Sequence, residues 1–233
     1  MKFAVEPTLA LAQADLQPGS RLAARDLPQP LGGVIKRGID ILLSGIAIVL
    51  LAPLLIGLAF LVQTTSAGPV FYGHSRVGFG GKTFKCWKFR SMVMNGDEVL
   101  AIYFRKNAGA QTEWSETQKL RQDPRVTPLG SVLRKLSLDE LPQLFNIFLG
   151  DMSVVGPRPI VADEVRRYGP SLGHYLRTRP GLTGLWQISG RSDVGYRQRV
   201  LLDRFYVRNW SLFKDLGIIL WTVPAVLRSR GSY

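Results

Sequence analysis

The longest apolar segment of the chain runs from residue 41 to residue 62. It contains 22 residues without a charge, which as a helix would extend about 33 Å and match the hydrocarbon thickness of a bilayer. Pro53 lies near its middle, where it removes one helical hydrogen bond. The pattern therefore predicts a membrane-associated helix over residues 34–63, kinked at Pro53.

The charges on either side of this segment bear on its topology. Lys36 and Arg37 precede it, and five basic residues follow it with no acidic residue between Gln63 and Arg90. Basic flanks mark the cytoplasmic side of a membrane segment, and here both flanks are basic. A re-entrant helix that bends at Pro53 and returns to the same face satisfies both observations. A kinked single span is the alternative.

A β-hairpin is predicted next, from β segments at residues 69–72 and 83–89 joined by a glycine-rich turn. The turn resembles a phosphate-binding P-loop, but that motif requires glycine where Arg76 stands, and no helical pattern follows. In the second segment, alternation places Lys88 on the same face as Phe84 and Cys86. A lysine on that face either snorkels or binds an anion.

Helical patterns occupy much of the remaining chain. Residues 96–122 are polar and predict helix with a loop, whereas residues 210–228 carry apolar side chains at helical spacing with Pro224 as an interruption. The second pattern suits both an amphipathic helix on a membrane and a helix in the protein core. Residues 1–33 lack apolar periodicity and the pattern of a secretory signal, so we expect a mobile N-terminal extension there.

Composition narrows the class of protein. Hydrophobic residues make up 46% of the 233 positions, which excludes a disordered or fibrous chain. Lys and Arg total 30 against 17 Asp and Glu, and the net charge of +13 favours polyanions, anionic lipids or phosphorylated substrates as partners. The single cysteine, Cys86, and two histidines are too few for a Cys/His zinc site or an internal disulfide.

The candidate chemistry begins at Asp139 and Glu140, which precede an apolar-periodic stretch. Ser137 and Glu140 have the spacing of a helix capping box, and acidic residues are favourable at a helix N-terminus whatever the function. Pro142 weakens this structural interpretation, because it has no N–H for the helix and predicts an irregular turn. Adjacent carboxylates point about 100° apart on a helix, so one can act as nucleophile while the other binds Mg²⁺.

Arginines surround this pair in contexts rich in proline and glycine. A guanidinium matches phosphate oxygens in pairs, and the collective pattern predicts an anion site, although any single arginine is typical of a solvated surface. The candidates are Arg134, Arg158, Arg179 and Arg191.

Three long motifs support a family resemblance. They are Lys-Leu-Ser-Leu-Asp-Glu-Leu-Pro-Gln-Leu (135–144), Gly-Asp-Met-Ser-Val-Val-Gly-Pro-Arg-Pro (150–159) and Arg-Pro-Gly-Leu-Thr-Gly-Leu-Trp-Gln-Ile-Ser-Gly-Arg (179–191). From about Lys36 to its end, the chain resembles the bacterial sugar transferases of the monotopic phosphoglycosyl transferase family. Within that family, it is most similar to the exopolysaccharide galactosyl-phosphate transferases.

The resemblance implies an α+β fold. Its parts are a re-entrant membrane helix over 34–63 and a small, mostly helical catalytic domain over 64–233, with a short hairpin and interfacial amphipathic helices. It also implies a monotopic protein on the cytoplasmic face of the inner membrane. The family's helix bends at a Ser-Pro pair, whereas Ala52 stands before Pro53 here.

The resemblance further implies residue roles and a reaction. Asp139 is the expected nucleophile and Glu140 the expected Mg²⁺ ligand, while Lys88, Arg134 and Asp203 match other active-site positions. The implied reaction moves hexose 1-phosphate from UDP-galactose or UDP-glucose to undecaprenyl phosphate, through an aspartyl phosphosugar and with release of UMP. It would begin an exopolysaccharide repeat unit. The sugar, and whether the protein is a monomer or a homodimer, stay open.

Two other functions fit parts of the sequence. A glycosyltransferase that moves the sugar alone would release UDP, and many such enzymes bind metal through an Asp-x-Asp pair, which is absent from this sequence. A membrane-tethered nucleic-acid binder would fit the charge of +13, but its basic residues would gather on one element, and here they are scattered. We therefore expect no nucleic-acid partner.

Overall fold

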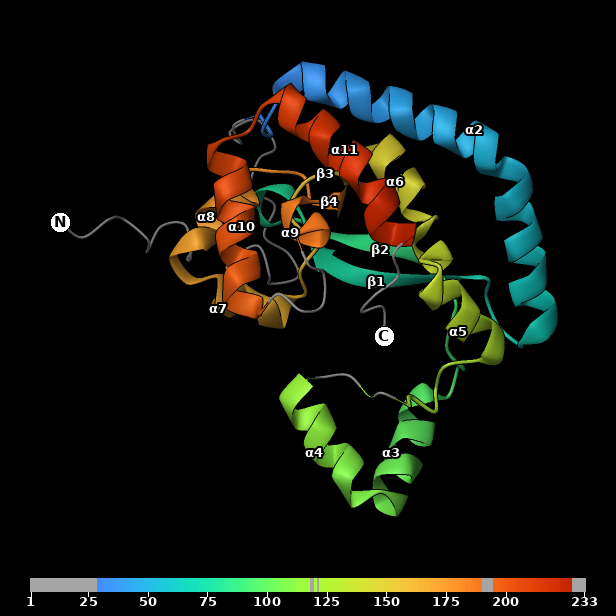
Figure 1. Ribbon diagram of the computed structural model, residues 1–233. Helices are drawn as coiled ribbons and strands as arrows, with labels where there is room; N and C mark the ends of the chain where they lie inside the picture. The colour runs from blue at the N-terminus through green and yellow to red at the C-terminus, as the bar shows by residue number, and fades with distance from the viewer. Residues whose placement is uncertain (1–28, 118–119, 121, 190–194, 228–233) are drawn as a thin grey trace. The chain divides into compact units, whose positions relative to one another are not determined.

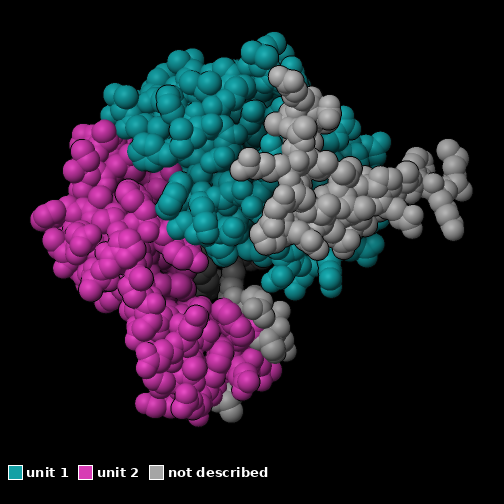
Figure 2. Space-filling view, turned by 180° about the vertical axis from the view of Figure 1, so that it is seen from behind, with its two compact units in different colours: residues 1–50, 73–87, 143–231 teal, residues 51–72, 88–142, 232–233 magenta. Residues whose placement is uncertain are grey.

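The computed structural model describes residues 29–117, 120, 122–189 and 195–227 (Figure 1). Most of the predicted N-terminal extension and Arg191 lie outside these residues. The chain forms two compact units, which Figure 2 shows in different colours. Unit 1 holds residues 1–50, 73–87 and 143–231, and unit 2 holds residues 51–72, 88–142 and 232–233.

The predicted apolar helix is present as α2, Gly33–Thr65, with Pro53 inside it. It is the one helix of the described residues that is long and apolar enough to cross a membrane. Each half of α2 buries a narrow stripe within its own unit and exposes apolar side chains elsewhere. In unit 1 the buried stripe is Lys36, Asp40 and Ser44, and in unit 2 it is Leu55, Leu58 and Val62.

The predicted hairpin is confirmed. Strands β1 (Phe71–Val77) and β2 (Thr83–Phe89) pair across a 3₁₀ turn, Phe79–Gly81, in which Gly80 has φ +65°, a conformation that glycine adopts without strain. The turn leads into a strand, whereas a P-loop would lead into a helix, so the prediction that this turn is not a P-loop is confirmed. Along β2, Cys86 is buried and Lys88 half-buried, so the predicted alternation also holds.

Four further helical segments lie in the described residues of unit 2. The expected helices of residues 96–122 are α3 (Gly96–Lys106) and α4 (Ala108–Thr117), followed by α5 (Pro128–Lys135) and the 3₁₀ turn η2 (Leu138–Glu140). The core of this unit is formed by one side of α2 together with β2 and α5. Its buried members are Leu55, Leu58, Val62, Phe89 and Leu133.

Unit 1 is built around a short parallel pair, β3 (Ser153–Val155) with β4 (Gly181–Thr183), in the register Ser153 to Gly181. The described helices that follow α2 in unit 1 are labelled in Figure 1. They are α6 (Gln143–Leu149), α7 (Val165–Tyr168), α8 (Leu172–Leu176), α9 (Leu185–Ile188), α10 (Tyr196–Arg208) and α11 (Leu212–Leu227). Helix α11 packs against both strands.

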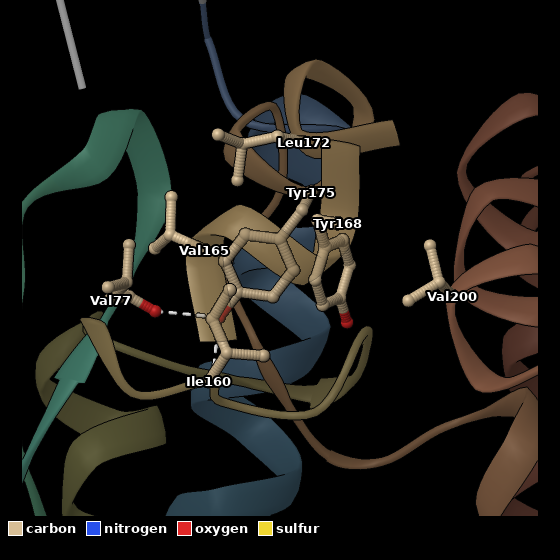
Figure 3. Packing of buried hydrophobic residues seen from close by; sticks show 7 residues of the cluster. All are labelled: Val77, Ile160, Val165, Tyr168, Leu172, Tyr175 and Val200. Carbon is tan, nitrogen blue, oxygen red and sulfur yellow. Dashed lines mark hydrogen bonds between the residues drawn. The ribbon is translucent and has the colours of Figure 1, made fainter. Parts of the chain in front are cut away.

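One core of unit 1 surrounds Tyr175 (Figure 3). The Tyr175 hydroxyl donates to the Val77 carbonyl at 2.6 Å and accepts from the Ile160 N–H at 3.2 Å, so it joins β1 to the segment that precedes α7. Its ring meets Tyr168 edge to face at 5.2 Å between centroids. Buried hydroxyls with such partners avoid the cost of an unsatisfied polar group.

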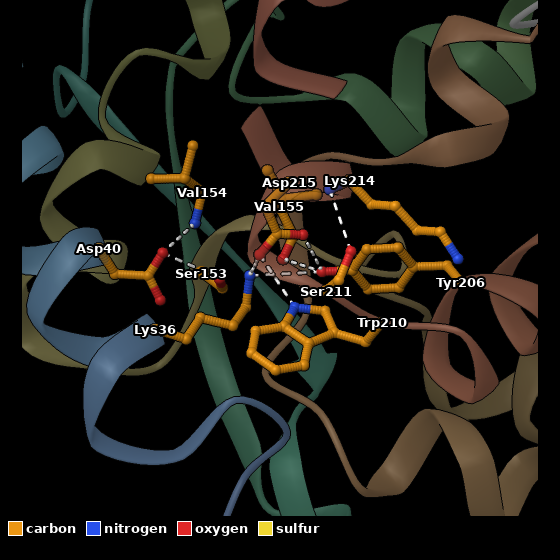
Figure 4. Close-up of polar contacts among 10 residues, drawn as sticks. All are labelled: Lys36, Asp40, Ser153, Val154, Val155, Tyr206, Trp210, Ser211, Lys214 and Asp215. Carbon is orange, nitrogen blue, oxygen red and sulfur yellow. Dashed lines mark hydrogen bonds and ion pairs between the residues drawn. The ribbon is translucent and has the colours of Figure 1, made fainter. Parts of the chain in front are cut away.

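A buried polar cluster holds the beginning of α2 within unit 1 (Figure 4). Lys36 Nζ lies 2.5 Å from Asp215 Oδ2 on α11. The same carboxylate accepts from the Tyr206 hydroxyl at 2.7 Å and from Trp210 Nε1 at 3.0 Å. Next to this cluster, Asp40 Oδ1 accepts from the Ser153 hydroxyl and the Val154 N–H.

The helix predicted over residues 210–228 is α11, and Pro224 lies inside it. Its buried face includes Asp215 and Ile218 and packs against β3, β4 and α9. Its opposite face exposes large apolar side chains, among which Phe213 is 86% exposed. The others are Leu216, Leu220 and Trp221. Core packing therefore accounts for one face of α11 only.

Candidate functional site

The Asp139-Glu140 pair lies on a 3₁₀ turn and not in the first turn of an α-helix. Ser137 precedes this turn with φ +56°, the one non-glycine residue of the described chain in the left-handed region, and its side chain makes no cap bond. The capping box is therefore wrong. Helix α6 begins at Gln143, directly after Pro142, because proline supplies no N–H for an earlier start. The expectation of an irregular turn is confirmed.

Lys88 faces both carboxylates. Its Nζ lies 2.6 Å from Glu140 Oε1 and 3.7 Å from Asp139 Oδ2. The side chain of Asp139 is 9% exposed, against 26% for Glu140 and 23% for Lys88. The fold thus brings together a buried carboxylate, a more accessible one and a cation, all three of which the sequence had marked as candidates.

The environment of Asp139 affects its protonation. Burial raises the pKa of its carboxyl above the ordinary value, since the charged form loses hydration. The positive charge of Lys88 lowers this pKa, the negative charge of Glu140 raises it, and Arg134 lowers it. Lys88 and Arg134 are therefore the two cations that favour the ionised form of Asp139.

Arg134 lies in the last turn of α5, a helix that Thr127 caps by accepting from the Gly130 N–H at 2.9 Å. Its Nε donates to the hydroxyl of Ser91 at 3.1 Å. Ser91 is buried and lies two residues beyond β2. No local pattern in the sequence around Ser91 indicates that it has an arginine partner.

Asp203 lies in unit 1, on the buried side of α10. Its Oδ2 accepts from the Tyr168 hydroxyl at 2.7 Å. Burial raises the pKa of Asp203 to about 7, while the bond from Tyr168 and the charges of Arg158 and Arg199 lower it. Tyr168 could not be predicted as the partner of Asp203 from the sequence, since the two residues are 35 positions apart.

The other predicted arginines have different surroundings in unit 1. Arg158 lies over the ring of Trp186 at 5.9 Å, and Arg199 lies over the same ring at 4.6 Å, so two cations share one aromatic side chain. Arg179 donates from Nε to the Gly150 carbonyl at 2.8 Å, which gives it a structural contact as well.

The carboxylate oxygens of the Asp139-Glu140 pair are of the ligand type that a divalent cation prefers. Mg²⁺ takes hard oxygen ligands and is held in phosphoryl-transfer sites by one or two carboxylates together with substrate phosphates. Asp139 and Glu140 supply such carboxylates. In the described part of the chain no group of three or more His, Cys, Asp or Glu side chains could hold a metal. A cation bound at the Asp139-Glu140 pair would therefore complete its coordination with substrate oxygens and water.

The family model of bacterial sugar transferases matches residues 31–229, and the chain belongs to this family. It is 58% identical to the exopolysaccharide production protein ExoY of Rhizobium meliloti, over 88% of this chain and 91% of that protein. It is 51% identical to the undecaprenyl-phosphate galactose phosphotransferase of Salmonella typhimurium, over 85% of this chain and 42% of that protein. It is 39% identical to the UDP-glucose:undecaprenyl-phosphate glucose-1-phosphate transferase of Escherichia coli, over 88% of this chain and 43% of that protein.

Proposed function

We propose that this sugar transferase moves a hexose 1-phosphate, from galactose or glucose, from the UDP-sugar to undecaprenyl phosphate and so begins an exopolysaccharide repeat unit. The observation that carries the proposal is the buried Asp139 carboxylate beside Glu140, with Lys88 Nζ 3.7 Å and 2.6 Å away, respectively. The family membership and the names of the relatives support the same reaction class.

The first half-reaction uses Asp139 as the nucleophile. One carboxylate oxygen attacks the phosphorus that carries the sugar, and the bond from this phosphorus to the oxygen of UMP breaks. The electron pair leaves with UMP, and the hexose 1-phosphoryl group stays on Asp139 as an acyl phosphate. In the second half-reaction, an oxygen of undecaprenyl phosphate attacks the same phosphorus, and the Asp139 carboxylate is released.

The neighbouring side chains assist by position and charge. Lys88 favours the ionised form of Asp139 and holds Glu140 by a charge-assisted hydrogen bond. Arg134 adds a second positive charge near the place where phosphate oxygens would lie. A Mg²⁺ ion bound by Glu140 would supply charge neutralisation for the diphosphate of the donor. A buried carboxylate reacts well only if such cations counter its raised pKa.

We also propose that α2 is re-entrant and that the protein is monotopic on the cytoplasmic face of the inner membrane. The contacts of α2 support this. Lys36, near its beginning, contacts Asp215, and Val62, near its end, packs in a cluster with Leu133. Both contacts are made by residues that follow α2, and the described chain after Thr65 has no second helix able to cross a membrane. Both ends of α2 then lie on the same side of the membrane.

The exposed face of α11 supports a contact of unit 1 with the membrane. Phe213, Leu216, Leu220 and Trp221 lie on it, and apolar and tryptophan side chains of this kind favour the interface between lipid and water.

A single cysteine placed at Val34 and another at Ser66, each in a Cys86→Ser background, would test the topology of α2. A membrane-impermeant thiol reagent should label both in inverted inner-membrane vesicles and neither in intact spheroplasts. Labelling of the two sites from opposite sides would refute the re-entrant helix.

The reaction is tested by nucleotide release. Detergent-purified protein receives undecaprenyl phosphate, Mg²⁺ and one UDP-sugar of a panel, and the nucleotide products are separated. UMP release from one donor, abolished in Asp139→Ala, is the expected result. Asp163→Ala, which changes an exposed acidic residue of unit 1, is the matched control and should keep full activity. Release of UDP would instead indicate transfer of the sugar alone, and full UMP release by Asp139→Ala would remove the covalent step.

A further inference from the structure

Helix α5 lies in direct contact with the backbone of Ser91. The Ser91 carbonyl accepts from the Thr127 N–H at 3.0 Å. A Cβ on Gly130 would come within 2.0 Å of the same carbonyl oxygen, so only glycine allows the first turn of α5 to approach this closely. Met92, the next residue, forms an isolated β-bridge with Val126. Ser91 is therefore held in place by contacts with the beginning of α5.

The side chain of Ser91 reaches the other end of the same helix. Its hydroxyl accepts from Arg134 Nε at 3.1 Å, and Ser91 is only 9% exposed. The Nε–H bond lies in the plane of the guanidinium group, so this hydrogen bond restricts the orientations that the plane can adopt. A long arginine side chain without such a contact samples many rotamers, and ordering it on substrate binding costs free energy.

We propose that Ser91 is a positioning residue that orients the Arg134 guanidinium for the phosphate groups of the donor. The inference rests on the proposed function, in which Arg134 acts on the UDP-sugar. Ser91 itself touches no reacting atom in this scheme. It presents the bidentate edge of Arg134 in a fixed direction before the donor binds, and planar recognition of phosphate depends on that direction.

The two half-reactions separate a positioning role from a loss of folded enzyme. In a mechanism with a covalent intermediate, kcat/KM for the UDP-sugar reports the first half-reaction, and kcat/KM for undecaprenyl phosphate reports the second. Ser91→Ala should lower kcat/KM for the UDP-sugar about tenfold and leave that for undecaprenyl phosphate within about twofold. Loss of folded protein would lower both to the same extent, and this result would overturn the proposal.

A double-mutant cycle tests the route through Arg134. Ser91→Ala should have almost no further effect when it is added to Arg134→Met, because the group it positions is already gone. Equal losses in the two backgrounds would overturn the proposal. Ser131→Ala is the matched control, since it removes an exposed hydroxyl from the same helix, and its kinetics should equal those of the wild type.

Failure of this proposal differs from failure of the proposed function. If Asp139→Ala abolishes UMP release while the Ser91 and Arg134 effects are additive, the reaction stands and only the positioning role is refuted. If Asp139→Ala retains UMP release, the covalent step is refuted, whatever the cycle between Ser91 and Arg134 gives.

Discussion

Replacing Lys36 by methionine tests the attachment of α2 to unit 1. Lys36 is 7% exposed, and its ammonium group lies between Asp215 Oδ2 at 2.5 Å and the Tyr206 hydroxyl at 3.3 Å. Methionine keeps most of the apolar stem but removes the charge. Asp215, itself 6% exposed, then keeps only the neutral donors Tyr206 and Trp210.

The expected cost follows from the burial of the pair. Removing one partner of a buried ion pair leaves an uncompensated charge and costs about 3–5 kcal/mol. For a chain of this length, each kcal/mol lowers Tm by about 2–4 °C. Lys36→Met should therefore lower Tm by roughly 6–20 °C. Asp215→Asn should lower it by a similar amount, because Lys36 then loses the carboxylate that its ammonium group contacts.

The assay is thermal unfolding in detergent, followed by circular dichroism, on both single variants and the double variant. The double variant Lys36→Met with Asp215→Asn contains neither charge, and asparagine still offers an oxygen to Tyr206 and Trp210. Its loss of stability should be smaller than the sum of the two single losses, by a coupling of about 2–3 kcal/mol. If the two losses simply add, the pair does not hold α2 by its charges, and the argument from burial is refuted.

Three further predictions concern unit 1. The Asp203 pKa of about 7 lies above the value of the unfolded chain, so the wild type should lose stability relative to Asp203→Asn as pH rises from about 4 to about 7. Tm measured at about pH 5 and about pH 8 checks this, and equal pH dependence would contradict it. In Gly181→Ala the new Cβ would lie 2.1 Å from the Gly156 nitrogen, so we expect a loss above about 3 kcal/mol, seen as a low yield of folded protein; a wild-type Tm would contradict the close packing of β3 and β4. Arg37 donates to the carbonyls of Ile147 and Phe148 at 2.6 and 2.7 Å, and Arg37→Lys should cost about 1–2 kcal/mol in thermal unfolding because lysine lacks the planar fork; an unchanged Tm would show that the fork is dispensable.

Local patterns predicted the elements well. Twenty-two uncharged residues around Pro53 indicated α2, and the glycines between two β segments indicated the hairpin. The alternation along β2 also placed Lys88 on the side of Cys86. These features depend on residues close together in the chain, where periodicity and backbone freedom are read directly from side-chain type.

The same kind of reasoning failed where local and tertiary preferences compete. Ser137 and Glu140 have the spacing of a capping box, yet Ser137 adopts a left-handed conformation and caps nothing. Pro142 already excludes an ordinary helix start, and Leu138 and Leu141 pack against the core of unit 2. The apolar contacts of these two half-buried leucines compete with the cap, which as one hydrogen bond would contribute only about 1 kcal/mol.

The sequence by itself determined that this protein has a long apolar helix, a net charge of +13 and an Asp-Glu pair within family motifs. Only the tertiary structure decided that Lys88 meets Glu140 across 52 positions, that Ser91 holds Arg134 and that Tyr168 holds Asp203. The physical reason is the distance along the chain between the residues that interact. Helix and strand formation depend on neighbours along the chain, whereas the partner of a charged or hydroxyl side chain is set by packing between segments distant in sequence, which no local pattern specifies.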